Sequence, residues 1–291
     1  MYGGHMGRVP IESRISAALG VGVRRTVPLA GGCVADVRSV DLDDGSRSVV
    51  KVGPPEARLD IEAAMLTRLA ETGVVPVPAV RHSEPGLLIM EYIEADGTRS
   101  AQGEADAADM LAALHAIPAE QFGFDQDTLI GGLPQPNGRM DDWPRFFAER
   151  RLLCMGRRAL GAGRLPGGTM DRLERLAADI DRFITPPPPR PGLIHGDIWS
   201  GNVLWHRGRV AALIDPAIYF ADPEIELAFI DLFGCFGRAF WDRCAERHQI
   251  RDGFFEIRRD VYNLYPLLVH ATLFGGGYAA GITRTLDTLG V

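Results

Sequence analysis

The sequence predicts an α+β fold of two lobes, a β-rich N-terminal lobe with one main helix and a mostly helical C-terminal lobe. Two observations lead to this prediction. Segments rich in β-branched residues dominate the first third of the chain, whereas helical spacing of apolar residues dominates the rest. A polar segment, 94–103, separates the two patterns and suits a linker. We therefore expect one lobe at residues 1–93 and the other at residues 94–291.

The N-terminal lobe begins with strands. Residues 34–42 and 47–52 are rich in β-branched residues, and a short Asp-Asp-Gly turn between them predicts a hairpin. Residues 59–71 carry apolar side chains at every fourth position, which predicts an amphipathic helix that ends at Gly73. A further apolar strand is expected at residues 87–93, so one helix packs on a small sheet.

The C-terminal lobe is expected to be mostly helical. The predicted helices are 106–117, 143–160, 170–184 and several from about residue 224 onward. A proline run, 186–189, forbids helix and forms a stiff extended spacer. Two short apolar strands follow, 193–194 and 210–214, and each ends in a polar cluster. The arginines in 145–164 alternate with apolar residues, which we interpret as a helix with one solvated face.

The composition argues against nucleic-acid-binding and membrane proteins. The formal net charge is −7, whereas a nucleic-acid footprint needs clustered positive charge. The most apolar late stretch, 267–280, contains His270 and is too short to span a bilayer. The cysteines show no metal-ligand spacing, and the first residues show no signal-peptide pattern. A reduced, cytoplasmic compartment is therefore expected.

The strongest chemical signal is a pair of loops that each follow an apolar strand. The first, LIHGDIWSGN, places Asp197 five residues before Asn202, which is the spacing of a kinase catalytic loop. The second, ALIDP, presents Asp215. A carboxylate can accept the proton of a substrate hydroxyl, while oxygen ligands hold Mg²⁺ against phosphates. Either Asp alone could be a turn former. Together with His195, the set predicts a protein-kinase-like fold with Asp197 as base and Asn202 and Asp215 as magnesium ligands.

A lysine and a glutamate of the N-terminal lobe fit the same chemistry. Lys51 lies in an apolar strand, and Glu62 lies in the first turns of the next predicted helix. In the kinase fold, such a pair positions the ATP phosphates. An unrelated strand lysine and a surface glutamate are the alternative, but the catalytic loop downstream favours the pair.

Two further segments are candidates for contacts with ATP. The first lies between two apparent strands and consists of Gly31, Gly32 and Cys33. Backbone amides can approach phosphates there, although a Gly-Gly hairpin explains the pattern equally well. The second ends the last strand before the linker and consists of Glu91, Tyr92 and Ile93. Main-chain groups at that junction are expected to meet the adenine.

Three aromatic residues are candidates for the substrate site: Trp199, Tyr219 and Tyr278. Trp199 lies between Asp197 and Asn202, where its ring either pins the loop to the core or contacts the substrate. Tyr219 and Tyr278 are expected to extend the same apolar wall. His195 is expected to stabilise the loop by hydrogen bonding.

With these residues, the chain resembles the fructosamine kinase (ketosamine-3-kinase) family, which is related to aminoglycoside phosphotransferases and choline kinases. The resemblance runs from about residue 30 to residue 278 through AGGCVAD, LAETGVVPVP, LIMEYI, HGDIWSGN, IDPAIYFADPEIELA and FGGGY. It implies ATP and Mg²⁺ as cofactors and phosphorylation of the 3-hydroxyl of a small-molecule or protein-bound ketosamine, which marks glycated proteins for repair. It also implies that Gly31–Cys33 is the phosphate loop and that Trp199 shapes the sugar site.

Two other functions remain open. An aminoglycoside or other small-alcohol kinase would favour an acidic surface for a polycation, and four acidic residues do cluster after the second loop: Asp222, Glu224, Glu226 and Asp231. Their helical spacing instead indicates a helix cap and a solvated face. A non-catalytic pseudokinase scaffold is less expected, because the base, both metal ligands and the lysine are all present.

The expected oligomeric state is a monomer or a redox-dependent dimer. Cys33 lies among backbone amides that favour anions, which would make its thiol reactive and allow a disulfide between two chains. Selection of a small residue for tight packing explains the same cysteine equally well.

Overall fold

The computed structural model describes residues 10–29 and 35–291. The N-terminal lobe is an antiparallel sheet in the order β1-β2-β3-β5-β4. Its strands are β1 (Val23–Pro28), β2 (Asp36–Leu42), β3 (Arg47–Val52), β4 (Val80–Glu84) and β5 (Leu87–Glu91). The predicted hairpin of β2 and β3 is confirmed, and the last strand ends two residues earlier than expected, at Glu91.

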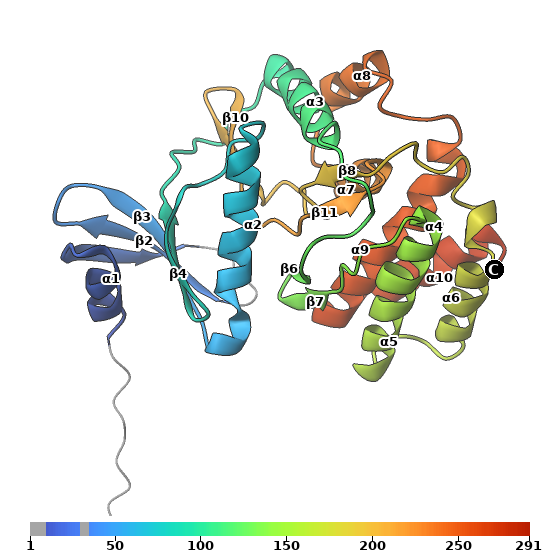
Figure 1. Ribbon diagram of the computed structural model, residues 1–291, viewed down its shortest axis with the longest axis horizontal. Helices are drawn as coiled ribbons and strands as arrows, with labels where there is room; N and C mark the ends of the chain where they lie inside the picture. Colours follow the sequence, from blue (N-terminus) through green and yellow to red (C-terminus); the bar gives the residue numbers. More distant parts are fainter. Residues whose placement is uncertain (1–9, 30–34) are drawn as a thin grey trace, which may run out of the picture.

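Helices cover both faces of this sheet, and apolar side chains of β5 pack against them on each face. Leu87 and Ile89 of β5 pack on one face with Ile15 of α1 (Ile11–Leu19), whereas Leu88 and Met90 pack on the other face beneath α2 (Leu59–Thr72). Because both faces are buried, β5 reads as an uninterrupted apolar run. In Figure 1, α2 lies between the sheet and the helical lobe, which brings its side chains to the boundary of the two lobes.

The predicted helix α2 is confirmed, and so is its predicted end at Gly73. Gly73 follows it in the left-handed conformation, with φ of 65°, and its amide bonds to the carbonyl of Ala70. The sequence analysis missed α1, the short helix η1 (Pro55–Ala57) and β4. β4 reads VRHSE, and its mixed polar composition conceals an edge strand that buries little of its surface.

The linker between the lobes is bonded to a hairpin of the C-terminal lobe. The amides of Asp96 and Gly97 donate to the carbonyl of Trp205, at 2.9 and 3.1 Å, and Gly208 donates back to Thr98 at 3.1 Å. The following helix α3 (Ala101–His115) begins five residues before the predicted start. Its N-cap is Ser100, whose hydroxyl accepts from the Gly103 amide.

The C-terminal lobe is mostly helical, as predicted, and its helices surround one large hydrophobic core. After α3, they are α4 (Trp143–Phe146), η2 (Phe147–Leu153), α5 (Cys154–Gly161), α6 (Thr169–Ala178), η3 (Ile180–Arg182), α7 (Glu224–Phe233), α8 (Arg238–Glu246), η4 (Phe254–Arg258), α9 (Arg259–Phe274) and α10 (Tyr278–Leu289). Among these described residues, no helix combines the length and the apolar character that a membrane crossing requires.

Short strand pairs place the polar loops at the boundary of the lobes. The pairs are β6 (Thr128–Ile130) with β7 (Leu133–Gln135), β8 (Gly192–Ile194) with β11 (Tyr219–Ala221), and β9 (Val203–His206) with β10 (Arg209–Leu213). β8 and β10 confirm the two predicted apolar strands. Each ends directly before one of the two loops singled out in the sequence, so a buried strand fixes the start of each loop.

Candidate active site

A lysine of the sheet contacts two carboxylates at the boundary of the lobes. Lys51 lies on β3, opposite Leu88 of β5, and its side chain is only 10% exposed. Its Nζ donates to Glu62 of α2 at 2.7 Å and to Asp215, which follows β10, at 2.6 Å. Burial alone would lower the pKa of Lys51, but the two carboxylates outweigh it and raise that pKa above its ordinary value. Lys51 is therefore a fixed positive charge.

Asp215 has an unusual backbone conformation. Its φ is 54°, in the left-handed region that Asp tolerates better than most residues. The carboxylate stays 37% exposed while it accepts from Lys51. Backbone strain of this kind persists where the surrounding structure enforces it, and it is frequent at functional sites.

The second polar pair lies in the loop after β8. Asn202 donates from Nδ2 to the Asp197 carboxylate and to the Asp197 carbonyl, both at 2.9 Å. The pKa of Asp197 is raised to about 7, chiefly by burial and also by the charges of Asp215 and Glu226, although the bond from Asn202 lowers it. A carboxyl group with a pKa near neutral can act as a general base at physiological pH.

The two loops are bonded to each other. Ala217 donates to the carbonyl of His195 at 2.8 Å, and Ile214 donates to the carbonyl of Asn202 at 3.0 Å. The ring of His195 is fully buried, which lowers its pKa, and its Nδ1 accepts from the Asp197 amide at 3.4 Å. The imidazole therefore stays neutral and supports the loop, the role expected from the sequence.

The donor set fits a magnesium ion that also binds phosphates. Among the residues that the structure describes, no group of three or more His, Cys, Asp or Glu side chains could hold a metal ion. Mg²⁺ instead often takes one or two carboxylates and completes its shell with phosphates and water. The exposed carboxylate of Asp215 could supply one such ligand. Because the amide nitrogen of Asn202 faces Asp197, its side-chain oxygen is the atom that can bind a metal.

Of the candidate contacts with ATP, the structure describes the segment that ends the last strand of the sheet. Gly31, Gly32 and Cys33 fall outside the described residues, and nothing in the described ranges supports a dimer through Cys33. Glu91 ends β5 opposite Ser48 of β3, one strand from Lys51. Tyr92 lies beneath the Arg47 guanidinium, and Ile93 follows it into the linker.

The three aromatic candidates lie in different environments. Trp199 is 43% exposed, and its ring covers Gly201 so closely that a Cβ atom there would lie 2.4 Å from it. Its ring therefore does not pin the loop to the core. Tyr219 does not extend the expected apolar wall of the substrate site, because its ring is buried. It stacks between Phe146, with centroids 5.9 Å apart, and the Arg151 guanidinium, 3.8 Å from its centroid.

The expectation that the arginines in 145–164 lie on a solvated face is wrong for Arg151. It is fully buried, and it donates to the Pro136 carbonyl at 2.7 Å and to Asn137 Oδ1 at 2.6 Å. The other described arginines of this stretch are at least partly exposed.

Tyr278 lies apart from the loops, in a row of aromatic rings that connects to them. It contacts His270, with ring centroids 5.1 Å apart, and His270 in turn contacts Phe233 at 4.8 Å. Phe233 contacts Phe229 at 4.8 Å, and Phe229 lines a small cavity beside Gly196 of the catalytic loop. The row therefore begins beside the candidate base and reaches Tyr278.

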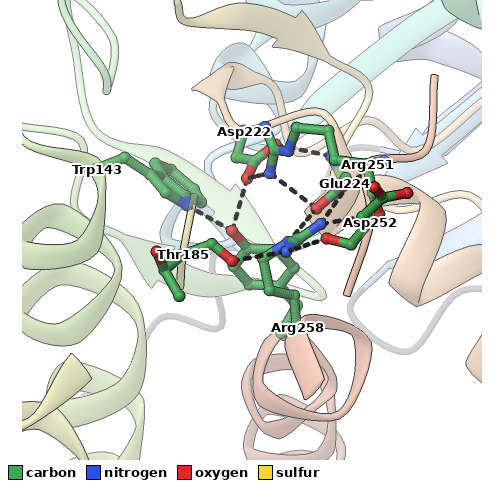
Figure 2. Close-up of polar contacts among 8 residues, drawn as sticks. Trp143, Thr185, Asp222, Glu224, Arg251, Asp252 and Arg258 are labelled. Atoms are coloured by element: carbon green, nitrogen blue, oxygen red, sulfur yellow. Dashed lines mark hydrogen bonds and ion pairs between the residues drawn. The ribbon is translucent and has the colours of Figure 1, made fainter. Parts of the chain in front are cut away.

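The expectation of a solvated acidic face after the second loop is wrong. Asp222, Glu224 and Glu226 were expected on a solvated face, yet each is at most 1% exposed. Figure 2 shows Asp222 and Glu224 beside Arg251 and Arg258, which approach from the segment around η4. Only Asp231 remains partly exposed, 3.4 Å from Arg259. A surface for a polycation is therefore not formed by these three buried carboxylates.

One supporting residue had no recognisable signal in the sequence. Gln135 of β7 donates to the carbonyl of Ala217 at 3.0 Å and accepts from the Tyr265 hydroxyl at 2.7 Å. It therefore ties the β6-β7 hairpin to the loop that carries Asp215. The turn of the hairpin and Gln135 lie in the segment IGGLPQPN, residues 130–137, but spacing alone does not indicate the contact.

Comparisons with known proteins agree with this geometry. A fructosamine kinase family model matches residues 10–290. A probable ketoamine kinase of Synechocystis is 35% identical over 88% of this chain and 86% of its own. The chloroplastic protein-ribulosamine 3-kinase of Arabidopsis thaliana is 30% identical over 89% of this chain and 80% of its own. A solved structure from Thermobifida fusca, described as a fructosamine-3-kinase, is 31% identical, covers 96% of this chain and 97% of its own, and superposes with a TM-score of 0.84.

Proposed function

The chain belongs to the fructosamine kinase family, and from this premise we propose that it is an ATP-dependent ketosamine kinase. It transfers the γ-phosphoryl group of ATP to the 3-hydroxyl of a sugar attached to an amine, either free or on a protein. The relatives named as ketoamine and ribulosamine kinases support this substrate class. Residues 1–93 form the proposed nucleotide-binding lobe, and residues 94–291 form the lobe that carries the catalytic and substrate sites.

Asp197 is the proposed general base. Its carboxylate accepts the proton of the attacking hydroxyl, and Asn202 holds it in place through the 2.9 Å bond from Nδ2. A pKa of about 7 leaves much of this group ionised at neutral pH. Position matters more than basicity in phosphoryl transfer, because the acceptor oxygen must lie in line with the phosphoryl group.

The opposite side of the site neutralises phosphate charge. Asn202 and Asp215 would hold Mg²⁺, which supplies charge neutralisation to the β- and γ-phosphates when bound. Lys51 is already held by Glu62 at 2.7 Å and points its ammonium toward Asp215, so it is oriented before the nucleotide arrives. Gly31–Cys33 would contact the phosphates, and the main chain at 91–93 would contact the adenine.

The sugar is proposed to pack against Trp199. A solvent-exposed indole two residues from the base offers a flat face to the C–H surface of a sugar. The aromatic row that begins beside Gly196 and reaches Tyr278 suits the less polar carrier of the amine.

The convergence of Lys51, Asp215, Asn202 and Asp197 at the lobe boundary is the observation that carries the proposal. The test measures ADP release by the purified protein with ribuloselysine, fructoselysine, kanamycin and choline as acceptors. We expect the ketosamines to give the highest kcat/KM. Asp197→Asn should lower kcat with ribuloselysine by about 100-fold or more. A far higher kcat/KM for kanamycin or choline, or near-wild-type turnover in Asp197→Asn, would contradict the proposal.

A further inference from the structure

A buried glutamate lies behind the catalytic loop. Glu226 is on α7 and is 1% exposed. Its Oε1 accepts the backbone N–H of Gly196 at 2.7 Å, and its Oε2 is 2.8 Å from Nε2 of His115 at the end of α3. The carboxylate therefore connects two helices to the residue that immediately precedes Asp197.

The chain turns at Gly196 as it enters the catalytic loop. The φ of this glycine is 85°, and a Cβ atom there would lie 2.3 Å from the Ala217 carbonyl oxygen, so no other residue fits. The peptide between His195 and Gly196 is held from two sides: its carbonyl accepts from the Ala217 amide at 2.8 Å, and its N–H donates to Glu226 at 2.7 Å. The next residue along the chain is the proposed base.

His115 holds the glutamate in turn. Nε2 of His115 lies 2.8 Å from the Glu226 carboxylate and donates to it, whereas the buried Nδ1 has no hydrogen-bond partner in the described part of the chain. The His115 carbonyl also lies 2.3 Å from where a Cβ of Gly192 would be, so the end of α3 packs directly on β8. Both the strand that enters the loop and the carboxylate behind it are therefore located by the same helix end.

We propose that Glu226, held by His115, is a positioning residue that sets the place of Asp197 through the Gly196 amide. The inference deepens the proposed function and rests on it, because that function assigns catalysis to the loop. A charged acceptor forms the stronger hydrogen bond to a backbone amide, and a displacement of a reacting group by about 1 Å can cost about 100-fold in rate. Turnover, rather than nucleotide affinity, therefore depends on Glu226.

The kinetic test compares three substitutions. Glu226→Leu removes the acceptor and should lower kcat by about 100-fold, with KM for ATP within about twofold of the parent. Glu226→Gln keeps an oxygen for Gly196 and can donate to His115 after a change of tautomer, so it should retain at least about a tenth of kcat. Glu224→Gln is the matched control. Glu224 is equally buried on the same helix but pairs with Arg258 and Arg251, so this change should lower stability while kcat per folded molecule is unchanged.

A substrate-free measurement completes the test. Hydrogen–deuterium exchange of peptides that cover 193–205 should be faster in Glu226→Leu and in His115→Leu than in the parent, and unchanged in Glu224→Gln. Parent-like kcat in folded Glu226→Leu would overturn the proposal. If Glu226→Leu does not fold, parent-like exchange in His115→Leu would do so. A parent enzyme that phosphorylates no ketosamine would count against the proposed function alone, because the exchange experiment needs no substrate.

Discussion

The ammonium of Lys51 on the sheet lies 2.6 Å from the carboxylate of Asp215, 164 residues later in the helical lobe. In the same position Lys51 also contacts Glu62. Lysine therefore bridges a residue of its own lobe and a proposed metal ligand of the other. Binding of magnesium and nucleotide would replace the contact between Lys51 and Asp215 with contacts to phosphate, while Glu62 keeps the ammonium oriented.

Lys51→Met should weaken use of ATP. The change removes the only charge that Glu62 orients toward the phosphates, so kcat/KM for ATP is expected to fall by about 100-fold or more. Steady-state kinetics at saturating ketosamine measure this effect. Arg68→Met is the control in the same lobe, because Arg68 pairs with Glu71 on the exposed face of α2. An unchanged kcat/KM in Lys51→Met would refute the role of the lysine.

Asp197→Asn should stabilise the metal-free protein more at pH 8 than at pH 5. The folded pKa is about 7, against an ordinary value of 3.8, so the folded chain holds a proton that the unfolded chain releases between these values. Stability therefore falls as pH rises through this window. With allowance for the partial exposure of Asp197, the gain at pH 8 is on the order of 1–2 kcal/mol.

Calorimetry in the presence of EDTA measures the effect of that substitution at both pH values. At pH 5 only the first part of the window between pH 3.8 and about 7 has been crossed, so the stabilisation by asparagine should be clearly smaller there than at pH 8. An equal stabilisation at pH 5 and pH 8 would mean that the carboxyl group is not held protonated by its surroundings.

Trp199→Ala should impair sugar turnover without an effect on the fold. The ring is 43% exposed, so its removal leaves no core cavity and the melting temperature should stay within about 2 °C of the parent. kcat/KM for ribuloselysine should fall by about tenfold or more, since an aromatic contact contributes about 0.5–1.5 kcal/mol beyond the area it buries. KM for ATP should be unchanged. Loss of ATP affinity together with sugar turnover would show that Trp199 shapes the whole loop.

Arg258→Met should destabilise the helical lobe strongly. The arginine is 1% exposed, and it donates from Nε to Glu224 at 2.6 Å and to the carbonyls of Thr185 and Asp252 (Figure 2). Its removal leaves a buried carboxylate short of a partner, which costs about 3–5 kcal/mol. Urea unfolding measures the loss. Arg238→Met is the control, because its pair with Asp242 is exposed and should contribute less than about 0.5 kcal/mol.

Local sequence patterns predicted most elements because each pattern reflects burial of one face. The four-residue spacing in α2 and the apolar runs before the two loops are examples, and the hairpin of β2 and β3 follows from its turn residues. β4 and α1 escaped prediction because both are short and carry polar side chains on an edge or an exposed face. Their place depends on the sheet that they join.

Contacts between residues that are far apart in the sequence could not be predicted from residue spacing. Helical periodicity correctly put Asp222 to Glu226 at the start of a helix, but it gave no sign that Arg251 and Arg258 cover them. Tyr219 was taken for an exposed ring because its partner, Arg151, lies 68 positions away in the sequence and is itself buried. By contrast, the loop residues Asp197 and Asn202 were found readily, because only five positions separate them.

The bonds between the linker and the β9-β10 hairpin limit how the two lobes can move. Asp96, Gly97 and Thr98 are attached to Trp205 and Gly208, so this part of the linker travels with the helical lobe. The sheet ends at Glu91. If the sheet turns relative to the helical lobe, residues 92–95 are therefore the part of the linker left to bend, beside the main chain proposed to meet the adenine.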